Sequence, residues 1–180
     1  MPESAQKYSN KVPIWRLVFL SVITFNLYQV YWFYKNWRFF KEKEKLEISP
    51  FWRAIFSVIF IYSILKRIFG LTKKKDLNKW HSPVVLTILW ILLEFMGLLD
   101  NIPQFLGDQM SVLSYVLLLL ATILPLLSVL VLIPAQRLLN NYWRKVESNL
   151  PIKPFTWWQI VLIIFFAFGF LFFWFGDLFL

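Results

Sequence analysis

Residues 116–133 read VLLLLATILPLLSVLVLI, a run of 18 residues without a charge. The run is apolar on every face, whereas the strands of membrane β-barrels alternate apolar and polar residues. A helix needs about 20 mostly apolar residues to cross the ~30 Å hydrocarbon core of a bilayer. Residues 160–175 form a second uncharged run. Both runs predict α-helices in lipid, because a helix satisfies its own backbone hydrogen bonds there.

The composition of the whole chain is that of a membrane protein. Of its 180 residues, 59% are hydrophobic and the mean hydropathy is +0.60, whereas soluble proteins are about 45–50% apolar. We predict an all-α, polytopic helical membrane protein with residues 1–180 as a single membrane domain. Its expected transmembrane helices are 83–99, 110–133 and 155–180, preceded by two N-terminal segments, 14–34 and 51–65, which either span or re-enter.

Charges beside these segments predict an orientation. The connections 35–49, 66–82 and 134–153 are rich in Lys and Arg, whereas residues 100–109 hold two aspartates and no basic residue. Positively charged loops stay in the cytoplasm. We therefore expect the three basic connections and the N-terminus to be cytoplasmic, and residues 100–109 and the C-terminus to be periplasmic.

The two N-terminal segments leave two topologies open, because all of their flanks are basic. Either both segments span and one basic connection lies outside, or both dip into the membrane and return to the cytoplasmic side. Asn26, with the preceding Thr24, interrupts the first segment near its middle. Half of that segment is long enough for only one leaflet. We favour the re-entrant arrangement.

A weak internal repeat is a further expectation. Asn36 is followed fourteen positions later by Pro50, and Asn140 is followed at the same distance by Pro154; an aromatic residue lies within two positions after each of them. A duplicated re-entrant unit accounts for this spacing. The recurrence of Trp, Pro and Arg at membrane interfaces accounts for it equally well.

Residues 15–37 read WRLVFLSVITFNLYQVYWFYKNW. This stretch resembles a group of small prokaryotic integral membrane proteins of unknown function that share the pattern S-x-x-T-F-G-x-Y-x-x-Y-W-x-Y-K. The resemblance covers about residues 13–40, with a fainter echo at 136–145. Asn26 stands where the pattern has Gly, and Asn is the residue after Gly that most readily adopts left-handed backbone. The resemblance implies residence in a bacterial inner (cytoplasmic) membrane and brings no activity with it.

Polar residues of the first segment define a candidate functional face. Ser21, Thr24, Tyr28 and Tyr31 recur at spacings of three and four, which would form one stripe on an unbroken helix. If the helix breaks at Asn26, the hydroxyls and the freed backbone groups gather at the break instead. The interrupting Asn26 joins them. Glu94 is also assigned to this candidate face, because an ionisable side chain inside a membrane costs free energy and is usually paired or water-facing. The alternative to a functional role is that Glu94 snorkels to the interface or pairs with a neighbouring helix.

Two arginines are candidate contacts for lipid headgroups. Arg16 follows Trp15 and Arg53 follows Trp52, each at the start of an apolar segment. Guanidinium presents a planar fork of donors to phosphate, and Trp prefers the same depth in the membrane. We expect these four residues to contact anionic lipid, either in bulk or at a defined site.

No catalytic, cofactor-binding or metal-binding residue is predicted. The chain has no Cys, and its one His, His81, lies in a basic connection without visible partners. The net charge is +9, but the basic residues lie in short connections beside apolar runs and not on one soluble face, so we expect no binding to nucleic acid. The expected function is a non-catalytic accessory or scaffold subunit that packs against partner membrane proteins, or copies of itself, and lipid. The alternative is a small oligomeric transporter, channel or lipid-handling protein that uses the interrupted first segment and Glu94.

Overall fold

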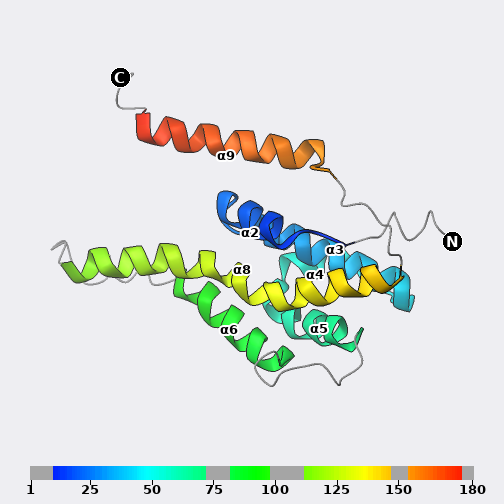
Figure 1. The fold of residues 1–180 in the computed structure, drawn as a ribbon. Helices are drawn as coiled ribbons and strands as arrows, with labels where there is room; N and C mark the ends of the chain where they lie inside the picture. Colours follow the sequence, from blue (N-terminus) through cyan, green and yellow to red (C-terminus); the bar gives the residue numbers. More distant parts are fainter. Residues whose placement is uncertain (1–9, 72–81, 98–111, 147–153, 176–180) are drawn as a thin grey trace.

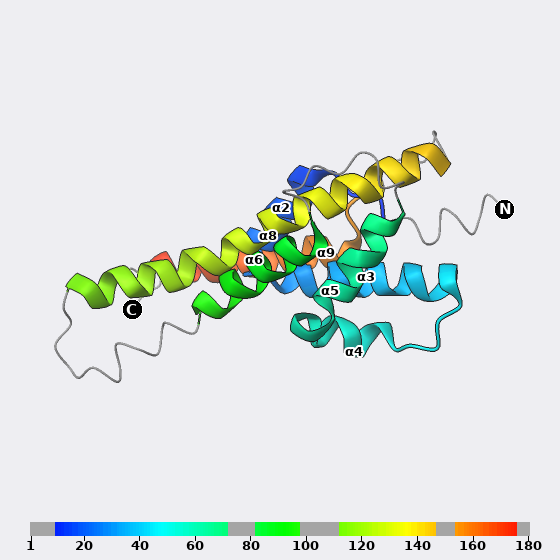
Figure 2. The same ribbon diagram turned by 90° about the horizontal axis from the view of Figure 1, so that it is seen from below.

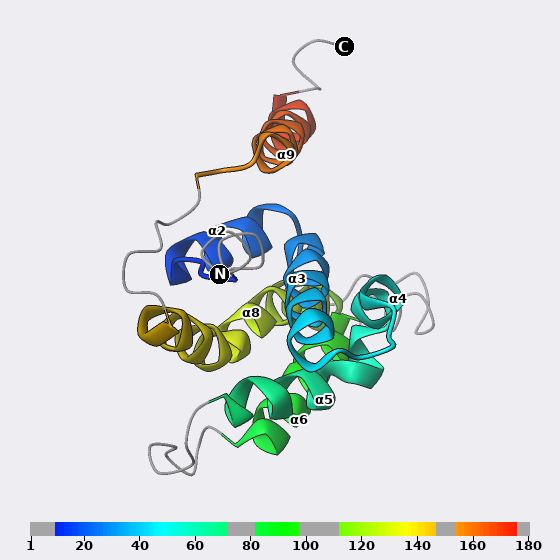
Figure 3. The same cartoon turned by 90° about the vertical axis from the view of Figure 1, so that its right-hand side faces the viewer.

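The structure, a computed structural model, describes residues 10–71, 82–97, 112–146 and 154–175. All regular structure in these ranges is helical, which confirms the all-α class. The helices are α2 (Ile14–Ile23), α3 (Leu27–Glu44), α4 (Pro50–Ile55), α5 (Ser57–Gly70), α6 (Pro83–Met96), α8 (Val112–Val146) and α9 (Trp157–Phe175). Helices α2 to α8 pack together, whereas α9 lies beside α2 on the side away from α6 (Figures 1 and 3).

One helix in the described part of the chain is long and apolar enough to cross a membrane. It extends from Tyr115 to Val146 within α8, whereas α2, α6 and the stretch Trp157–Gly169 of α9 are apolar but shorter. The two N-terminal apolar segments are each divided between two helices, which shortens every piece. The polytopic arrangement therefore stays a prediction.

The first apolar segment is interrupted where the sequence predicts it. Helix α2 ends at Ile23 and α3 begins at Leu27, and Phe25 and Asn26 between them have φ of 46° and 67°. The chain reverses at this turn (Figure 2), so that α3 leads back toward the end of the molecule where α2 begins. The second apolar segment also turns back, at Phe56 between α4 and α5.

Two helices extend into the predicted basic connections. α3 continues past residue 34 to Glu44, and α8 continues past residue 133 to Val146. Lys, Glu and Arg are good helix formers, and a helix keeps its own backbone hydrogen bonds in water as well as in apolar surroundings. The basic ends are therefore helical rather than loops.

The basic ends of several helices meet at one end of the molecule. The N–H of Val12, just before α2, donates to Asn140 Oδ1 at 3.1 Å, and Lys43 Nζ donates to the Tyr142 hydroxyl at 2.9 Å. Near the end of α5, Arg67 forms an ion pair with Glu44 of α3. Both ends of the α2–α3 hairpin therefore lie beside the C-terminal end of α8.

Polar side chains are buried together with an apolar core between the helices, while further large apolar side chains cover the outer faces. Gln29, Ser128 and Gln136 are buried, whereas Leu92 of α6 and Leu119 of α8 are exposed. Soluble proteins bury apolar side chains preferentially and rarely expose large contiguous apolar patches. This distribution suits apolar surroundings, in which polar groups find partners only inside the protein.

The two copies of the predicted weak repeat differ in structure. After Pro50 the chain forms the six-residue α4, which packs along α3. After Pro154 it forms the 19-residue α9, which contacts α2. The common spacing is therefore not accompanied by common packing.

Candidate functional site: a polar cluster at the helix break

Asn26 connects the turn between α2 and α3 to two other helices. Its left-handed backbone, with φ of 67°, is one that Asn adopts more readily than other non-glycine residues. Its Nδ2 donates to the carbonyl oxygen of Pro125 at 2.7 Å and lies 3.3 Å from both Ser128 Oγ and Glu94 Oε1. One side-chain amide thus contacts both α8 and α6.

Gln29 and Ser128 complete the connections. Gln29 Nε2 donates to Ser128 Oγ at 2.8 Å and to Asn26 Oδ1 at 2.9 Å, and Gln29 Oε1 accepts from Trp90 Nε1 at 2.8 Å. The Ser128 hydroxyl donates to Glu94 Oε1 at 2.6 Å. We call these five residues, Asn26, Gln29, Trp90, Glu94 and Ser128, the break cluster. Its bonds hold α3, α6 and α8 together.

The helices carrying the break cluster approach closely. A Cβ added to Gly97, at the end of α6, would lie 3.2 Å from Cγ of Pro125 in α8. Such a distance is tighter than ordinary van der Waals contact, so any larger residue at 97 would displace its neighbour. Glycine therefore lets α6 bring Glu94 within reach of Ser128.

The structure joins only part of the predicted functional face to this site. Asn26 and Glu94 lie together, as hydrogen-bond partners. Thr24 instead bridges the break locally: its hydroxyl donates to the Leu20 carbonyl at 2.6 Å and accepts from the Tyr28 N–H at 3.0 Å. Ser21 is fully buried, and its hydroxyl has no hydrogen-bond partner among the described residues.

The two tyrosines of the predicted face point toward α9. Gln159 Nε2 donates to the Tyr28 hydroxyl at 3.5 Å, and the ring of Tyr31 meets Trp158 edge-on with centroids 4.4 Å apart. The single stripe of an unbroken helix does not form, because the chain reverses at Asn26 and the residues on either side of the turn belong to two differently directed helices.

Sequence reasoning missed Gln29, Trp90 and Ser128. A signal for them exists at helical spacing: Gln29 is three residues after Asn26, and Trp90 is four residues before Glu94. Ser128 interrupts an otherwise apolar run. A search one helical turn from each interrupting group would have found Gln29 and Trp90, whereas Ser128 shares its only signal, a hydroxyl in an apolar run, with Thr122.

A second polar cluster, also missed, fixes the segment before α2. Gln136 of α8 accepts from Trp32 Nε1 at 2.6 Å and donates to the carbonyl of Asn10 at 3.1 Å. Asn140 accepts from the Val12 N–H and donates to the Val12 carbonyl at 2.8 Å. The start of the chain's described part is thereby bonded to the basic end of α8.

The four candidate headgroup contacts lie at helix starts. Trp15 is 59% exposed and Trp52 is 57% exposed. The guanidinium of Arg16 lies 4.2 Å from the Phe155 ring centroid, and that of Arg53 lies over two aromatic rings at 4.6 and 4.9 Å. Stacking of this kind fixes the plane of the guanidinium.

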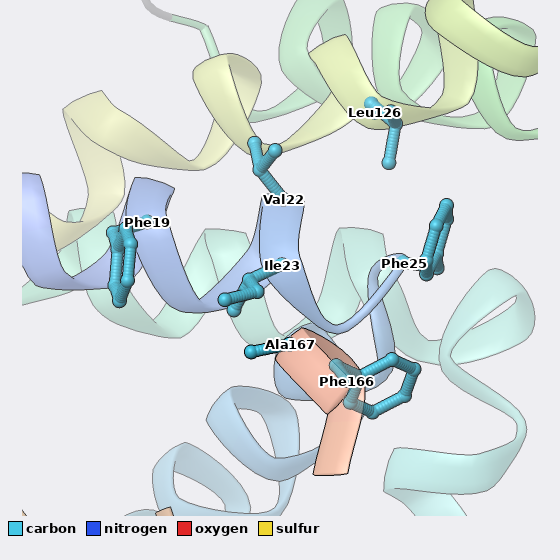
Figure 4. A pocket seen from close by; sticks show the side chains of 7 residues that line it. All are labelled: Phe19, Val22, Ile23, Phe25, Leu126, Phe166 and Ala167. Atoms are coloured by element: carbon cyan, nitrogen blue, oxygen red, sulfur yellow. The ribbon is translucent and has the colours of Figure 1, made fainter. Parts of the chain in front are cut away.

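An apolar groove of about 750 Å³ lies between α2, α8 and α9 (Figure 4). Phe19 and Ile23 of α2, Phe25 of the turn, Leu126 of α8, and Phe166 and Ala167 of α9 are among its lining residues. The groove lies on the side of α2 that faces α9, away from the contacts of Asn26 with α6. It is a second candidate site with a chemistry different from that of the break cluster.

Some predicted features lie outside the described residues, namely His81, most of the connection 66–82, and the acidic stretch 100–109. Across the described ranges, no group of three or more His, Cys, Asp and Glu side chains is placed to hold a metal ion. No family model matches the chain, and no curated protein or solved structure matches it. The resemblance to small prokaryotic membrane proteins thus rests on the motif alone and stays a prediction.

Proposed function

We propose that the chain is a non-catalytic membrane protein that acts as a helical scaffold or accessory subunit in a bacterial inner membrane. The observation that carries this proposal is the distribution of polarity: the break cluster is bonded to itself across three helices, and the outer faces are apolar. An unpaired polar group in hydrocarbon costs several kcal/mol. Mutual pairing therefore stabilises one arrangement of helices, whose outer faces contact lipid and partner helices.

The proposed topology has both N-terminal segments re-entering from the cytoplasm. Its support is that Val12 and Lys43, at the two ends of the α2–α3 hairpin, both contact the C-terminal part of α8. In an ordinary spanning segment these two positions would lie on opposite sides. The positive-inside rule assigns this basic end to the cytoplasm, and α9 then leads to a periplasmic C-terminus.

Purification and reconstitution test the scaffold proposal. We expect the chain to co-purify in mild detergent as a stable assembly, with itself or with a partner membrane protein, and to give liposomes no solute flux above that of empty liposomes. Thr122→Val, which removes an exposed hydroxyl of α8, is the control for variants of the break cluster. A specific flux that Glu94→Ala abolishes and Thr122→Val leaves intact would contradict the scaffold role.

A lipid-handling protein is the second candidate, and the apolar groove favours it. The groove opens between α2 and α9 and is lined by apolar side chains. A transporter or channel centred on Glu94 has less support, because Oε1 of this carboxylate already accepts from Ser128 and Asn26.

A further inference from the structure

We propose that the groove between α2, α8 and α9 binds one acyl chain of an anionic phospholipid of the cytoplasmic leaflet, with the lipid phosphate at Arg16. This inference rests on the proposed residence in a membrane. It assigns a defined ligand class to a site that the break cluster does not use.

The shape of the groove suits a flexible apolar chain. Its volume of about 750 Å³ is within the range of ~300–1,000 Å³ that is usual for small-molecule pockets. Figure 4 shows Phe19 and Ile23 on one wall and Phe166 and Ala167 on another. Lipid tails are as apolar as these side chains, so apolar contact alone does not select one lipid. Selection must come from the fit of the groove and from the headgroup.

The headgroup contact lies one helical turn from the groove. Trp15 and Phe19 are four residues apart on α2 and so lie on the same face of the helix. Trp15 therefore lies between the groove, which Phe19 lines, and the start of the helix. There Arg16 lies over the ring of Phe155, at the beginning of the α9 segment, and Trp15 meets the same ring with centroids 6.0 Å apart. Guanidinium recognises phosphate through charge and paired N–H donors, and Trp favours the interface.

The length of α2 favours a lipid over a spanning helix. This helix carries Trp15 and Arg16 at its start and the groove residue Ile23 at its end. Its ten residues rise about 15 Å, which is half of the ~30 Å hydrocarbon thickness. The rings of Phe25 and Phe166 approach at the far end, with centroids 6.1 Å apart. An acyl chain that starts in one leaflet needs this half-thickness, whereas a partner transmembrane helix needs the full thickness.

Native mass spectrometry of the detergent-purified full chain, titrated with phosphatidylglycerol or phosphatidylcholine, tests the assignment. We expect one phosphatidylglycerol to be retained in preference to phosphatidylcholine. Arg16→Gln should weaken retention of phosphatidylglycerol about fivefold, the usual effect of one basic side chain near an anionic surface. Arg137→Gln, which removes an exposed charge of α8, is the matched control and should have no such effect.

A second pair of variants tests the groove itself. Ala167→Trp should fill the groove and remove the bound lipid, whereas Val161→Trp, at an exposed position of α9 outside the lining, should retain it. If Ala167→Trp does not fold, Val22→Trp takes its place as the filled variant, because Val22 lines the groove from α2. If the wild-type chain retains both lipids equally, the bound lipid is annular only and the proposal is overturned. The same holds if the filled and the control variants retain phosphatidylglycerol equally. Recovery of the wild-type chain from carbonate-washed membranes tests membrane residence separately. If the chain stays in the membrane but fails the lipid tests, only the groove assignment is overturned.

Discussion

The side-chain nitrogen of Asn26 lies 2.7 Å from the carbonyl oxygen of Pro125. Asn26 forms the turn between α2 and α3, and Pro125 lies inside α8. In the membrane that we propose for this chain, a turn would expose polar groups that water cannot satisfy. This contact therefore fixes the one interruption of the first apolar segment to the longest helix of the described chain.

Substitutions of Asn26 test this relationship. Asn26→Gly keeps the left-handed backbone but loses the bonds to Pro125 and Glu94, whereas Asn26→Leu loses the bonds and adds about 1–2 kcal/mol of left-handed strain. We expect the melting temperature in one detergent to fall in the order wild type, Gly, Leu. A Leu variant that melts at or above wild type, with the Gly variant clearly below, would rule out the broken segment.

Ser128→Ala tests the centre of the break cluster. It removes the hydroxyl that accepts from Gln29 and donates to Glu94, and leaves buried polar groups without that partner at a cost of about 1–3 kcal/mol. Denaturation of detergent-solubilised protein should show a loss of this size. Thr122→Val, on the same helix but exposed, should change stability little, and equal losses for the two variants would contradict the role of the cluster.

Asn140→Ala should release the segment before α2. The Val12 N–H bonds to the Asn140 side chain, so its amide should exchange with solvent deuterium faster in this variant by hydrogen-exchange mass spectrometry. Asn141→Ala, which changes the exposed neighbouring residue, serves as the control. Unchanged protection of Val12 in the Asn140 variant would show that another contact holds the segment.

Accessibility of introduced cysteines tests the topology, because the natural chain has none. Lys43→Cys and Arg144→Cys lie near each other at the basic ends of α3 and α8 and should both be protected from an impermeant reagent in intact cells. Gln104→Cys, in the stretch 100–109 that we expect to be periplasmic, should be labelled. Labelling at position 43 without labelling at position 144 would restore an ordinary spanning arrangement of the first segment.

Local properties of the sequence were sufficient to predict the helical class and the interruption at Asn26. Long apolar runs leave the helix as the structure that satisfies the backbone in lipid, and Asn tolerates left-handed backbone. The same local signals misplaced the helix ends, because charged residues such as those of 35–44 continue a helix as well as apolar residues do.

The partners of Asn26 were decided only by the tertiary structure. Glu94 was singled out because a carboxylate in an apolar run is unusual, but nothing near it in the sequence indicates Asn26 or Ser128 as its neighbours. Tyr28 and Tyr31, which share the helical spacing of the first segment, turn instead to α9. Helix conformation depends on residues within a few positions, whereas hydrogen bonds between helices depend on how whole faces pack, and that packing joins residues 68 and 99 positions apart.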